Sequence, residues 1–581
     1  MEYLGPARTL QFATRALISF VQRCGHVPMS QAPLNPTPGS LAAQEHPRNF
    51  PLQVFALAFL VPLAYAAYTN HAWDDWYITF RAAKNLAVGN GLVFTIGERV
   101  HSFTSPLGTL IPALLSYMTG NVSDDLVLWL YRIINCAVLG AAAINLLAIL
   151  RHLKVDFWLS ILAIGMVILD AKLVDFSING METAFMAFFL VLAIRAHVIP
   201  VARPVLTLGL AWAGLMWTRP DSVIYIAALA FAFLVFPCGR ERSRAGILRQ
   251  YFQSGLVALL VYGPWLIWAW SYYGSFVPHT IVAKGLRTYT IPLVQEASTT
   301  IQRMLAFPLT GLFRGTSLHQ VFAPSYVNLG GWPSLFWIGG YIAWICAFAW
   351  VFPFLRPVTR ALSVVALLAH LYLGFIVKFV YPWYLPSVMI ITVMIFALLV
   401  DQILAREQRF NSARLKSSIA LMFLAVTVAI TLCTAYQIAL QQEIIESNRR
   451  HIGVWLRDNS TSHRDRVFLE PLGYIGFFSN LKMYDFPGLS SPEVVAARRS
   501  LRTDDYARLI AYLRPEWLVL RPKVVKRIGV SNRALLEREY SVARVFDVSK
   551  DVDSIAILPG RAYLKFDQTF VVYRRNDARL K

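Results

Sequence analysis

Charged residues are scarce in this chain of 581 residues: they make up 15% of it, against 56% hydrophobic residues. A soluble globular domain carries about a quarter charged residues, so this composition excludes an ordinary soluble protein and indicates a membrane protein. Lys and Arg outnumber Asp and Glu, 54 to 33, for a net charge of +21. This excess fits either nucleic-acid binding or the positive-inside bias of membrane proteins, and the positions of the charges decide between them.

Cysteine is also rare, and none of the five cysteines lies after residue 440. This excludes a disulfide framework and a cysteine-based zinc site in the C-terminal part of the chain. The sequence also lacks a glycine-rich phosphate loop ending in Lys-Ser or Lys-Thr, and it lacks a His-Glu-x-x-His motif. Both absences argue against an ATPase and against a zinc protease.

Eleven apolar stretches have the length and composition of membrane-spanning helices, although the third and sixth are short. They lie at about 52–69, 126–150, 157–170, 183–199, 204–218, 222–236, 251–272, 333–355, 360–380, 384–404 and 418–440. A further apolar piece, residues 107–118, falls short of the ~20 residues needed to span, and Pro106 and Pro112 interrupt it. We therefore expect an interfacial or re-entrant helix there.

The basic residues test this assignment, because they gather on the cytoplasmic side of membrane proteins. With 107–118 left out, five basic clusters fall on one side: Arg151/His152/Lys154, Arg195/Arg203, Arg240/Arg242/Arg244/Arg249, Arg356/Arg360 and Arg406/Arg409/Arg414/Lys416. The pattern explains the basic excess without nucleic acid. It predicts a multi-pass protein of the bacterial inner membrane, with the N-terminus cytoplasmic and the C-terminus periplasmic.

Three parts follow from this reading. Residues 1–50 are polar after Met29 and are predicted to form a mostly disordered cytoplasmic extension. Residues 51–440 form the transmembrane part, with a large outer loop at 70–125. Residues 441–581 alternate predicted strands (466–470, 517–521, 570–574) with predicted helices (441–456, 491–500, 504–513). The fold class is thus a polytopic α-helical membrane protein with a C-terminal α/β extracytoplasmic domain.

A pair of acids, Asp74 and Asp75, follows the first span directly. Asp75 is expected to cap a short amphipathic helix from about residue 76 to 87, with Arg81 and Lys84 on one side of it. Paired carboxylates at the bilayer surface can deprotonate a hydroxyl while nearby cations hold a phosphate leaving group. The same spacing also fits a helix cap beside a solvated acid. Two acids beside a phosphate often bind a divalent cation, which the sequence leaves open.

Two more ionisable residues lie at predicted outer turns. Glu182 opens the fourth span, where the helix dipole alone would favour a carboxylate. Arg219 lies between two spans and is either a phosphate ligand or the ion-pair partner of Asp221.

The outer loop after residue 273 adds two further candidates. Lys284 is placed to meet a phosphate, whereas His279 is an acid, a metal ligand or a plain loop residue. Tyr384 belongs to an aromatic cluster that marks a membrane boundary, and such rings also stack on sugars.

These motifs together carry a resemblance. The loop DDWYITFRAAKNLAVGNGLVFTIGERVHSFTSP resembles the first outer loop of GT-C-type glycosyltransferases, in particular their arabinofuranosyltransferase-like branch. NGMET is similar to that branch's G-L-E-T, TRPDS to T-R-P-E-G, and YYGSFVPHTIVAK to Y-Y-G-x-x-x-P-N-T-x-x-A-K. DFPGL at 485–489 is similar to the D-x-x-G-L of the soluble tail. The resemblance covers most of residues 52–490.

The resemblance implies a polyprenyl-phosphate-linked sugar as donor, entering from the membrane, and an envelope glycan or lipid as acceptor on the periplasmic side. It implies Asp74 as the general base of an inverting displacement, with Asp75 close behind. Arg219 and Lys284 would grip the phosphate and Arg81 would order the loop. No nucleotide is required.

Three departures lie near the expected sugar site. His279 stands where the family pattern has Asn, Thr95-Ile96 replaces Asn-Pro, and Ser102-Phe103 replaces a Gly-aromatic pair. The sequence therefore favours a glycosyltransferase, with arabinofuranose as one sugar that the resemblance implies. The alternative is a lipid-linked sugar transporter or flippase, which predicts midplane charges and paired broken helices in two repeated halves. The sequence shows neither.

Overall fold

The computed structural model describes residues 49–238, 243–286, 298–299, 301–302, 320–324, 332, 337–377, 380–406, 412–532, 534–555 and 558–576. The predicted N-terminal extension, apart from its last two residues, lies outside the described residues. Most of the outer loop that follows Lys284 also lies outside them.

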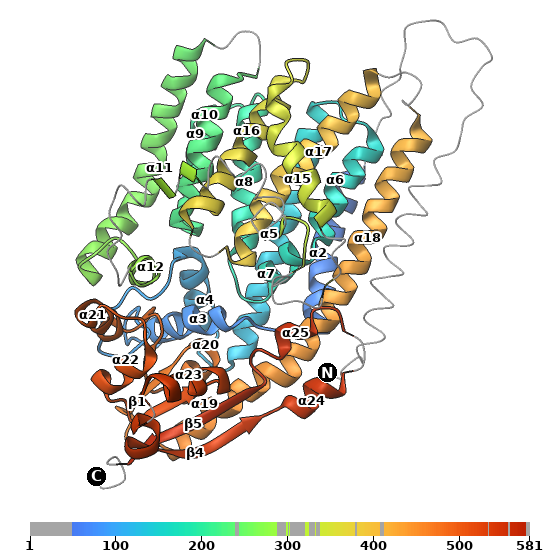
Figure 1. Ribbon diagram of the computed structural model, residues 1–581. Helices are drawn as coiled ribbons and strands as arrows, with labels where there is room; N and C mark the ends of the chain where they lie inside the picture. The colour runs from blue at the N-terminus through green and yellow to red at the C-terminus, as the bar shows by residue number, and fades with distance from the viewer. Residues whose placement is uncertain are drawn as a thin grey trace, which may run out of the picture.

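A bundle of helices forms the upper part of the molecule (Figure 1). A helix overlaps each of the eleven predicted apolar stretches. These helices are α2 (Phe50–Thr69), α5 (Asp124–His152), α6 (Phe157–Leu169), α8 (Thr183–Val198), α9 (Pro204–Thr218), α10 (Val223–Val235), α11 (Arg244–Tyr273), α15 (Trp337–Phe348), α16 (Pro357–Leu371), α17 (Leu385–Arg406) and α18 (Ala413–Leu440).

Six helices of the described part are long and apolar enough to cross a membrane, and a seventh is added if α6 and α7 (Ala171–Ile178), which are bent by 43°, form one span. Five more apolar helices are 10–17 residues long. A polytopic helical membrane protein is thereby confirmed. The number of eleven spans and the sidedness stay predictions.

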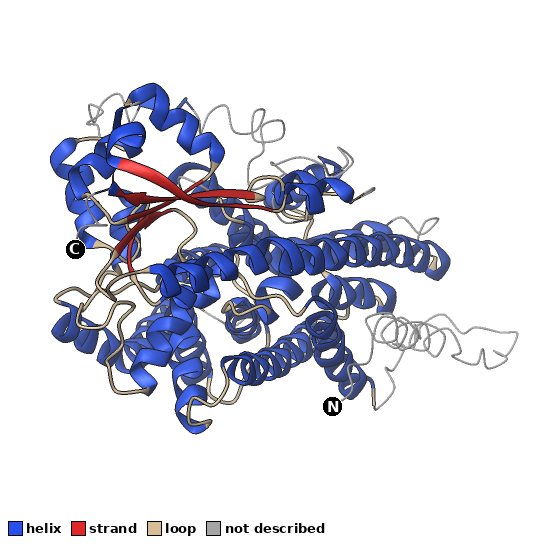
Figure 2. Cartoon of the chain, turned by 90° about the horizontal axis from the view of Figure 1, so that it is seen from below, coloured by secondary structure: helices blue, strands red, loops and turns tan. Residues whose placement is uncertain are grey.

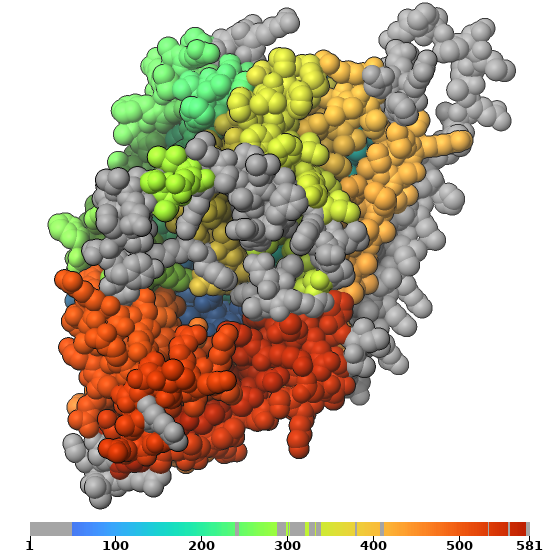
Figure 3. Space-filling model, in the orientation of Figure 1, coloured from blue at the N-terminus to red at the C-terminus, as the bar shows by residue number. Residues whose placement is uncertain are grey.

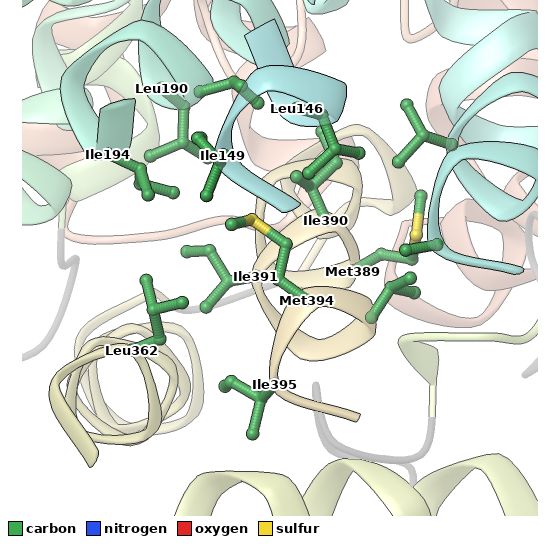
Figure 4. Packing of buried hydrophobic residues seen from close by; sticks show 14 of the residues in the cluster. Leu146, Ile149, Leu190, Ile194, Leu362, Met389, Ile390, Ile391, Met394 and Ile395 are labelled. Atoms are coloured by element: carbon green, nitrogen blue, oxygen red, sulfur yellow. The ribbon is translucent and has the colours of Figure 1, made fainter. Parts of the chain in front are cut away.

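Most residues of helix α17 are buried inside the bundle. Figure 4 shows its side chains packed against α5, α8 and α16. The labelled residues are Met389, Ile390, Ile391, Met394 and Ile395 of α17, Leu146 and Ile149 of α5, Leu190 and Ile194 of α8, and Leu362 of α16.

Two shorter helices of the outer loop lie where the bundle meets the C-terminal part. Helix α3 (Asp74–Ala87) begins two residues earlier than predicted, with Trp73 at its N-cap. Asp75 is therefore not the cap. Both acids lie in the first turn, where the helix dipole favours carboxylates. Helix α4 (Pro106–Met118) occupies the short apolar piece, and the Ser105 hydroxyl caps it by accepting from the Gly108 N–H at 2.9 Å.

The C-terminal residues 441–576, called the tail below, contain a five-stranded sheet in the order β2-β1-β3-β5-β4. The strands are β1 (Arg466–Leu469), β2 (Lys482–Asp485), β3 (Trp517–Leu520), β4 (Tyr540–Asp547) and β5 (Thr569–Arg575). Strands β2, β1 and β3 are parallel, whereas β5 and β4 are antiparallel to their neighbours. Figure 2 shows the sheet seen along its edge, beside the helices of the bundle.

The helices of the tail are α19 (Ser447–Asn459), α20 (Gly473–Ser479), α21 (Pro492–Leu501), α22 (Tyr506–Leu513), α23 (Pro522–Ser531), α24 (Ser549–Ser554) and α25 (Arg561–Leu564). Strands β1, β3 and β5 coincide with the three predicted strands. Helix α18 runs through the π-helical turn Gln441–Glu446 into α19. In Figure 3 the tail covers the lower face, and part of the outer loop (blue) is visible between the tail and the bundle.

Candidate active site

The two neighbouring acids of the outer loop face different surroundings. The Asp74 carboxylate accepts hydrogen bonds from the backbone N–H groups of Gly473 and Tyr474, both at 2.9 Å. Arg449 Nη1 lies 3.9 Å from Asp74 Oδ1. A Cβ atom at Gly473 would lie 1.8 Å from the Asp74 carbonyl oxygen, so only glycine permits this approach. Burial raises the pKa of Asp74, and the positive charge of Arg449 partly opposes this rise. Asp74 thus joins α3 to the tail.

Asp75 lines a cavity of about 650 Å³ instead. No described residue gives its carboxylate a hydrogen bond or an ion pair. Burial raises the pKa of Asp75 to about 6; Lys284 opposes the rise, and the negative charges of Asp74 and Glu182 add to it. A carboxylate with a pKa close to neutrality is suited to accept a proton from a bound hydroxyl.

Three parts of the chain build the walls of this cavity. The outer loop contributes Asp75 and residues 102–105, and the bundle contributes Glu182, Arg219 and Tyr384 among others. The tail contributes Phe486, Pro487, Leu489, Arg498 and Asp504. The volume falls in the range of small-molecule sites, which commonly lie where separate parts of a protein meet.

Arg219 forms a paired cluster in the wall. Its Nε and Nη2 atoms bind the two oxygens of Asp221 at 2.9 and 3.2 Å, and its Nη1 binds Glu182 Oε1 at 3.1 Å. The guanidinium carbon lies 4.6 Å from the centre of the Tyr384 ring. Burial alone would lower the pKa of Arg219, but Asp221, Tyr384 and Glu182 together raise it well above its usual value. The ion pair with Asp221 is thus present, and it lines the cavity. The role of Arg219 as a phosphate ligand stays a prediction.

Lys284 is the cavity's other basic group from the bundle side. It lies on the short helix α12 (His279–Gly285) and is exposed to the cavity. Its Nζ atom lies 5.2 Å from the centre of the Tyr381 ring. Within the described ranges it has no ion-pair partner. Desolvation by the walls lowers the pKa of Lys284, while Asp75 raises it.

The remaining predicted residues lie outside the cavity lining. Arg81 donates to the tail carbonyls of Gly476 at 2.7 Å and Leu481 at 3.1 Å, so it holds the loop against the tail. Lys84 pairs with Asp124 at 2.7 Å.

His279 contributes its backbone N–H, which donates to the His101 carbonyl at 2.9 Å. Burial lowers the pKa of His279. The predicted donor-binding set thus separates into four cavity residues (Glu182, Arg219, Lys284, Tyr384) and three outside it (Arg81, Lys84, His279).

Arg498 is a cavity residue that the sequence reasoning missed. It pairs with Asp504 at 2.7 Å and donates to the carbonyls of Ala283 and Pro487 at 3.0 and 2.9 Å. It therefore joins α12 to the loop after β2. That loop keeps its shape because the Asp485 carboxylate accepts from the backbone N–H of Ser490 at 2.9 Å and of Gly488 at 3.2 Å. The DFPGL motif was the only signal in the sequence for this wall.

The sequence left open whether Asp74 and Asp75 bind a divalent cation. Among the described residues, no group of three or more His, Cys, Asp or Glu side chains is arranged to hold a metal ion. The oxygens of Asp74 accept from the backbone of the tail, whereas Asp75 lines the cavity. A divalent cation at this pair stays a prediction.

The fold and this cavity define a class: a polytopic membrane protein with a GT-C-like fold and an acid-lined cavity between its bundle and its tail. ArnT from Cupriavidus metallidurans in the apo state superposes with a TM-score of 0.50 at 13% identity, over 92% of this chain and 98% of that chain. The same ArnT bound to undecaprenyl phosphate aligns with a TM-score of 0.48 at 12% identity, over 91% and 98%. At such low identity the likeness concerns the fold alone.

Sequence similarity points to particular relatives. A terminal β-(1→2)-arabinofuranosyltransferase of Corynebacterium glutamicum is 30% identical over 236 residues, which are 36% of this chain and 33% of the relative. A protein of the same name from Mycobacterium tuberculosis is 27% identical over 299 residues, or 44% and 43%. The domain of unknown function DUF8728 matches residues 436–573. The chain is therefore arabinofuranosyltransferase-like and GT-C-like, as its motifs predicted. Its matches span about a third to two-fifths of the length of these curated relatives.

Proposed function

We propose that this protein is a membrane glycosyltransferase that moves a sugar from a polyprenyl-phosphate donor to an envelope glycan or another acceptor on the periplasmic side. One observation carries the proposal: Asp75 and Lys284 line the same cavity, and neither has an ion-pair partner among the described residues. The other charged groups of the wall are paired, Arg219 with Asp221 and Glu182, and Arg498 with Asp504. An unpaired acid and an unpaired cation are what a proton transfer and a departing phosphate require.

In the proposed reaction, the Asp75 carboxylate takes the proton of an acceptor hydroxyl as that oxygen attacks C1 of the donor sugar. The bond from C1 to the acceptor oxygen forms while the bond from C1 to the phosphate oxygen breaks, so the configuration at C1 inverts. The polyprenyl phosphate leaves with the electron pair, and the Lys284 ammonium stabilises its new charge. The proton remains on Asp75 until solvent removes it.

Asp75 takes the place of Asp74 as the proposed base, because the oxygens of Asp74 accept hydrogen bonds from Gly473 and Tyr474. Arg219, held by two carboxylates and the Tyr384 ring, is proposed to position the phosphate rather than to neutralise it alone. Arabinofuranose is proposed as the sugar, because it is what the names of the two curated relatives specify for those proteins.

The test is sugar transfer by the purified full chain in lipid nanodiscs, from radiolabelled polyprenyl-phosphate arabinose and from the mannose and glucose equivalents. We expect transfer by the wild type and a loss of about 10²- to 10⁴-fold in kcat for Asp75→Asn, as removal of a general base typically causes. Asp458→Asn is the matched control, since the Asp458 side chain is 57% exposed and, among the described residues, pairs with its neighbour Arg457.

Two results would contradict the proposal. Undiminished transfer by Asp75→Asn would remove that residue from the role of base. Donor movement across liposomes without transfer from any donor would favour the flippase alternative.

A further inference from the structure

Positive charge is concentrated on three helices of the tail, α21, α22 and α23 (Figure 1). Residues 492–531, which contain these helices, carry nine Lys and Arg side chains but only four Asp and Glu side chains. All four acids have partners: Asp505 accepts from a backbone N–H of α22, and the other three pair with Lys482, Arg498 and Arg466. Six of the cations are exposed and have no ion-pair partner among the described residues. They are Arg499, Arg502, Arg508, Lys523, Lys526 and Arg527.

The three helices form one layer over the sheet of the tail. Helix α22 packs against both α21 and α23, while α21 contacts β2 and α23 contacts β5. Apolar side chains of all three helices share one core cluster with Phe468, Leu518 and Leu520 of the sheet. The apolar side of the layer is thus buried, and the six cations lie on its outward side. This outward side is called the basic layer below.

Neither membrane topology nor contact with lipid explains the basic layer. The positive-inside bias gathers Lys and Arg on the cytoplasmic side, whereas the tail is predicted to be periplasmic. A helix that lies on a bilayer inserts an apolar face, but Val524 and Ile528 of α23 are buried against the sheet. The large apolar side chains that these helices expose are Tyr512 and Val530, one on α22 and one on α23. Such a surface suits a soluble polyanion better than a bilayer.

One end of the basic layer adjoins the cavity. Arg498 and Asp504 line the cavity and bind each other at 2.7 Å. Arg499 follows Arg498 directly, and Arg502 lies two residues before Asp504. A polymer held along the basic layer would therefore have one end at the wall of the cavity that the tail contributes.

We infer that the basic layer binds an anionic glycan, one that carries carboxylate or phosphate groups, and leads it to the cavity as the acceptor. The inference rests on the proposed function for the role of acceptor. Arg binds carboxylate and phosphate through two parallel hydrogen bonds, and Lys binds them as a point charge. A polymer with repeated charges can contact cations on all three helices at once, so weak contacts add up to useful affinity.

The test measures binding of defined probes to the full chain in nanodiscs of phosphatidylcholine, a lipid without net charge. The probes are polygalacturonate, which is an anionic glycan, and its methyl ester, which has the same backbone without the charge. We expect polygalacturonate to bind about tenfold or more tightly than the ester, and to bind more weakly as salt rises. The variant Lys523→Gln/Lys526→Gln/Arg527→Gln should raise the Kd for polygalacturonate about tenfold, at roughly twofold for each exposed charge.

A second triple variant is the matched control. Arg457→Gln/Lys550→Gln/Lys565→Gln also removes three positive charges from exposed positions of the tail, but outside the basic layer. It should leave the Kd for polygalacturonate unchanged. Because all six positions are exposed, both variants should unfold at the temperature of the wild type, which thermal unfolding checks.

Three results would overturn the inference: the same Kd for the wild type and the basic-layer variant, an equal loss of affinity in the control, or equal binding of the methyl ester. A fourth is capture of the protein by phosphatidylglycerol vesicles through these three cations while polygalacturonate stays unbound. That result would assign the surface to lipid head groups. Binding of polygalacturonate in the expected pattern, without sugar transfer from any donor, would instead contradict the proposed function alone.

Discussion

Asp74 and Asp75 are neighbours in sequence and share the first turn of α3, yet their carboxylates have opposite surroundings. Asp74 is surrounded by partners: two backbone N–H groups of the tail and, further away, the Arg449 guanidinium. Asp75 has no such partner within the part of the chain that the structure describes, and it lines the cavity. Successive side chains on a helix point about 100° apart, so one turn can serve an interface and a cavity at once.

This difference separates the carboxylate that stabilises the fold from the carboxylate proposed to act in the reaction. A buried charge costs free energy unless it is paired, and proteins keep unpaired ones chiefly at functional sites. Asp74 is linked through Arg449 to a buried ionic cluster in which Arg449 also binds Glu446 at 2.8 Å and Asp567. Asp567 in turn binds Arg521. The acid nearest the tail thus completes a network that holds the tail against the outer loop.

The largest effect should come from breaking that network at its centre. Arg449→Met leaves Glu446 and Asp567 buried without their main cation, so we expect a loss of about 3–5 kcal/mol in the free energy of unfolding, typical of a broken buried ion pair. Thermal unfolding with proteolysis of the tail measures it. The control is Arg457→Met, because Arg457 is 50% exposed and pairs only on the surface. Similar stability of both variants would show that the network does not hold the tail.

A direct exchange of roles is the next test. Asp74→Asn removes the charge that accepts from Gly473 and Tyr474, so we expect a loss of about 1–3 kcal/mol in stability and less than about a tenfold loss in kcat per folded molecule. Asp75→Asn should show the reverse pattern, with kcat strongly reduced and stability retained. Thermal unfolding and transfer assays on the same preparations separate the two. If Asp74→Asn abolishes transfer in well-folded protein, Asp74 is the base, as the family resemblance implied.

The acidic limb of the pH profile offers a third contrast. Since burial raises the pKa of Asp75 from 3.8 to about 6, the proposed base is protonated in acid. We expect kcat/KM to rise with pH through about 6 and to fall to about a tenth of its plateau near pH 5. The folded state binds the extra proton between these pKa values, so stability should fall as pH rises from about 4 to about 6. Asp75→Asn should remove this slope in stability, and an unchanged slope would contradict the assignment.

The helical architecture was predictable from the sequence because membrane-spanning helices consist of long runs of apolar residues. All eleven predicted stretches contain helices, and α4 lies where the short apolar piece was noted. The tail was harder. Strands β1, β3 and β5 carry buried apolar runs. Strand β2, KMYD, has a charged residue at each end, and β4 is exposed at five of its eight positions and in part at a sixth. A strand with charged ends or with mostly exposed positions has no apolar pattern that separates it from a loop.

The candidate site was predictable as a set of residues but not as an arrangement. The motifs identified Asp75, Glu182, Arg219, Lys284 and Tyr384, and all five line one cavity. Which acid faces that cavity depends on the tail, whose Gly473 approaches Asp74 from about 400 positions away in the chain. Arg498 was missed for the same reason. The spacing of residues within a motif does not predict a contact between segments so far apart in the sequence.

The smallest effect should come from changing Lys84, a predicted donor ligand that does not line the cavity. Its ammonium pairs with Asp124 at 2.7 Å, and both side chains are 35% exposed. Exposed pairs of this type contribute about 0–1 kcal/mol, so Lys84→Met should shift the unfolding free energy by no more than that and leave the donor KM unchanged. Lys284→Met is the contrasting variant, since it removes the unpaired cation of the cavity and should weaken donor use strongly. If both variants raise the donor KM equally, Lys84 also contributes to donor binding. Helix α3 would then contact the lipid donor through a second face, the one that carries Lys84.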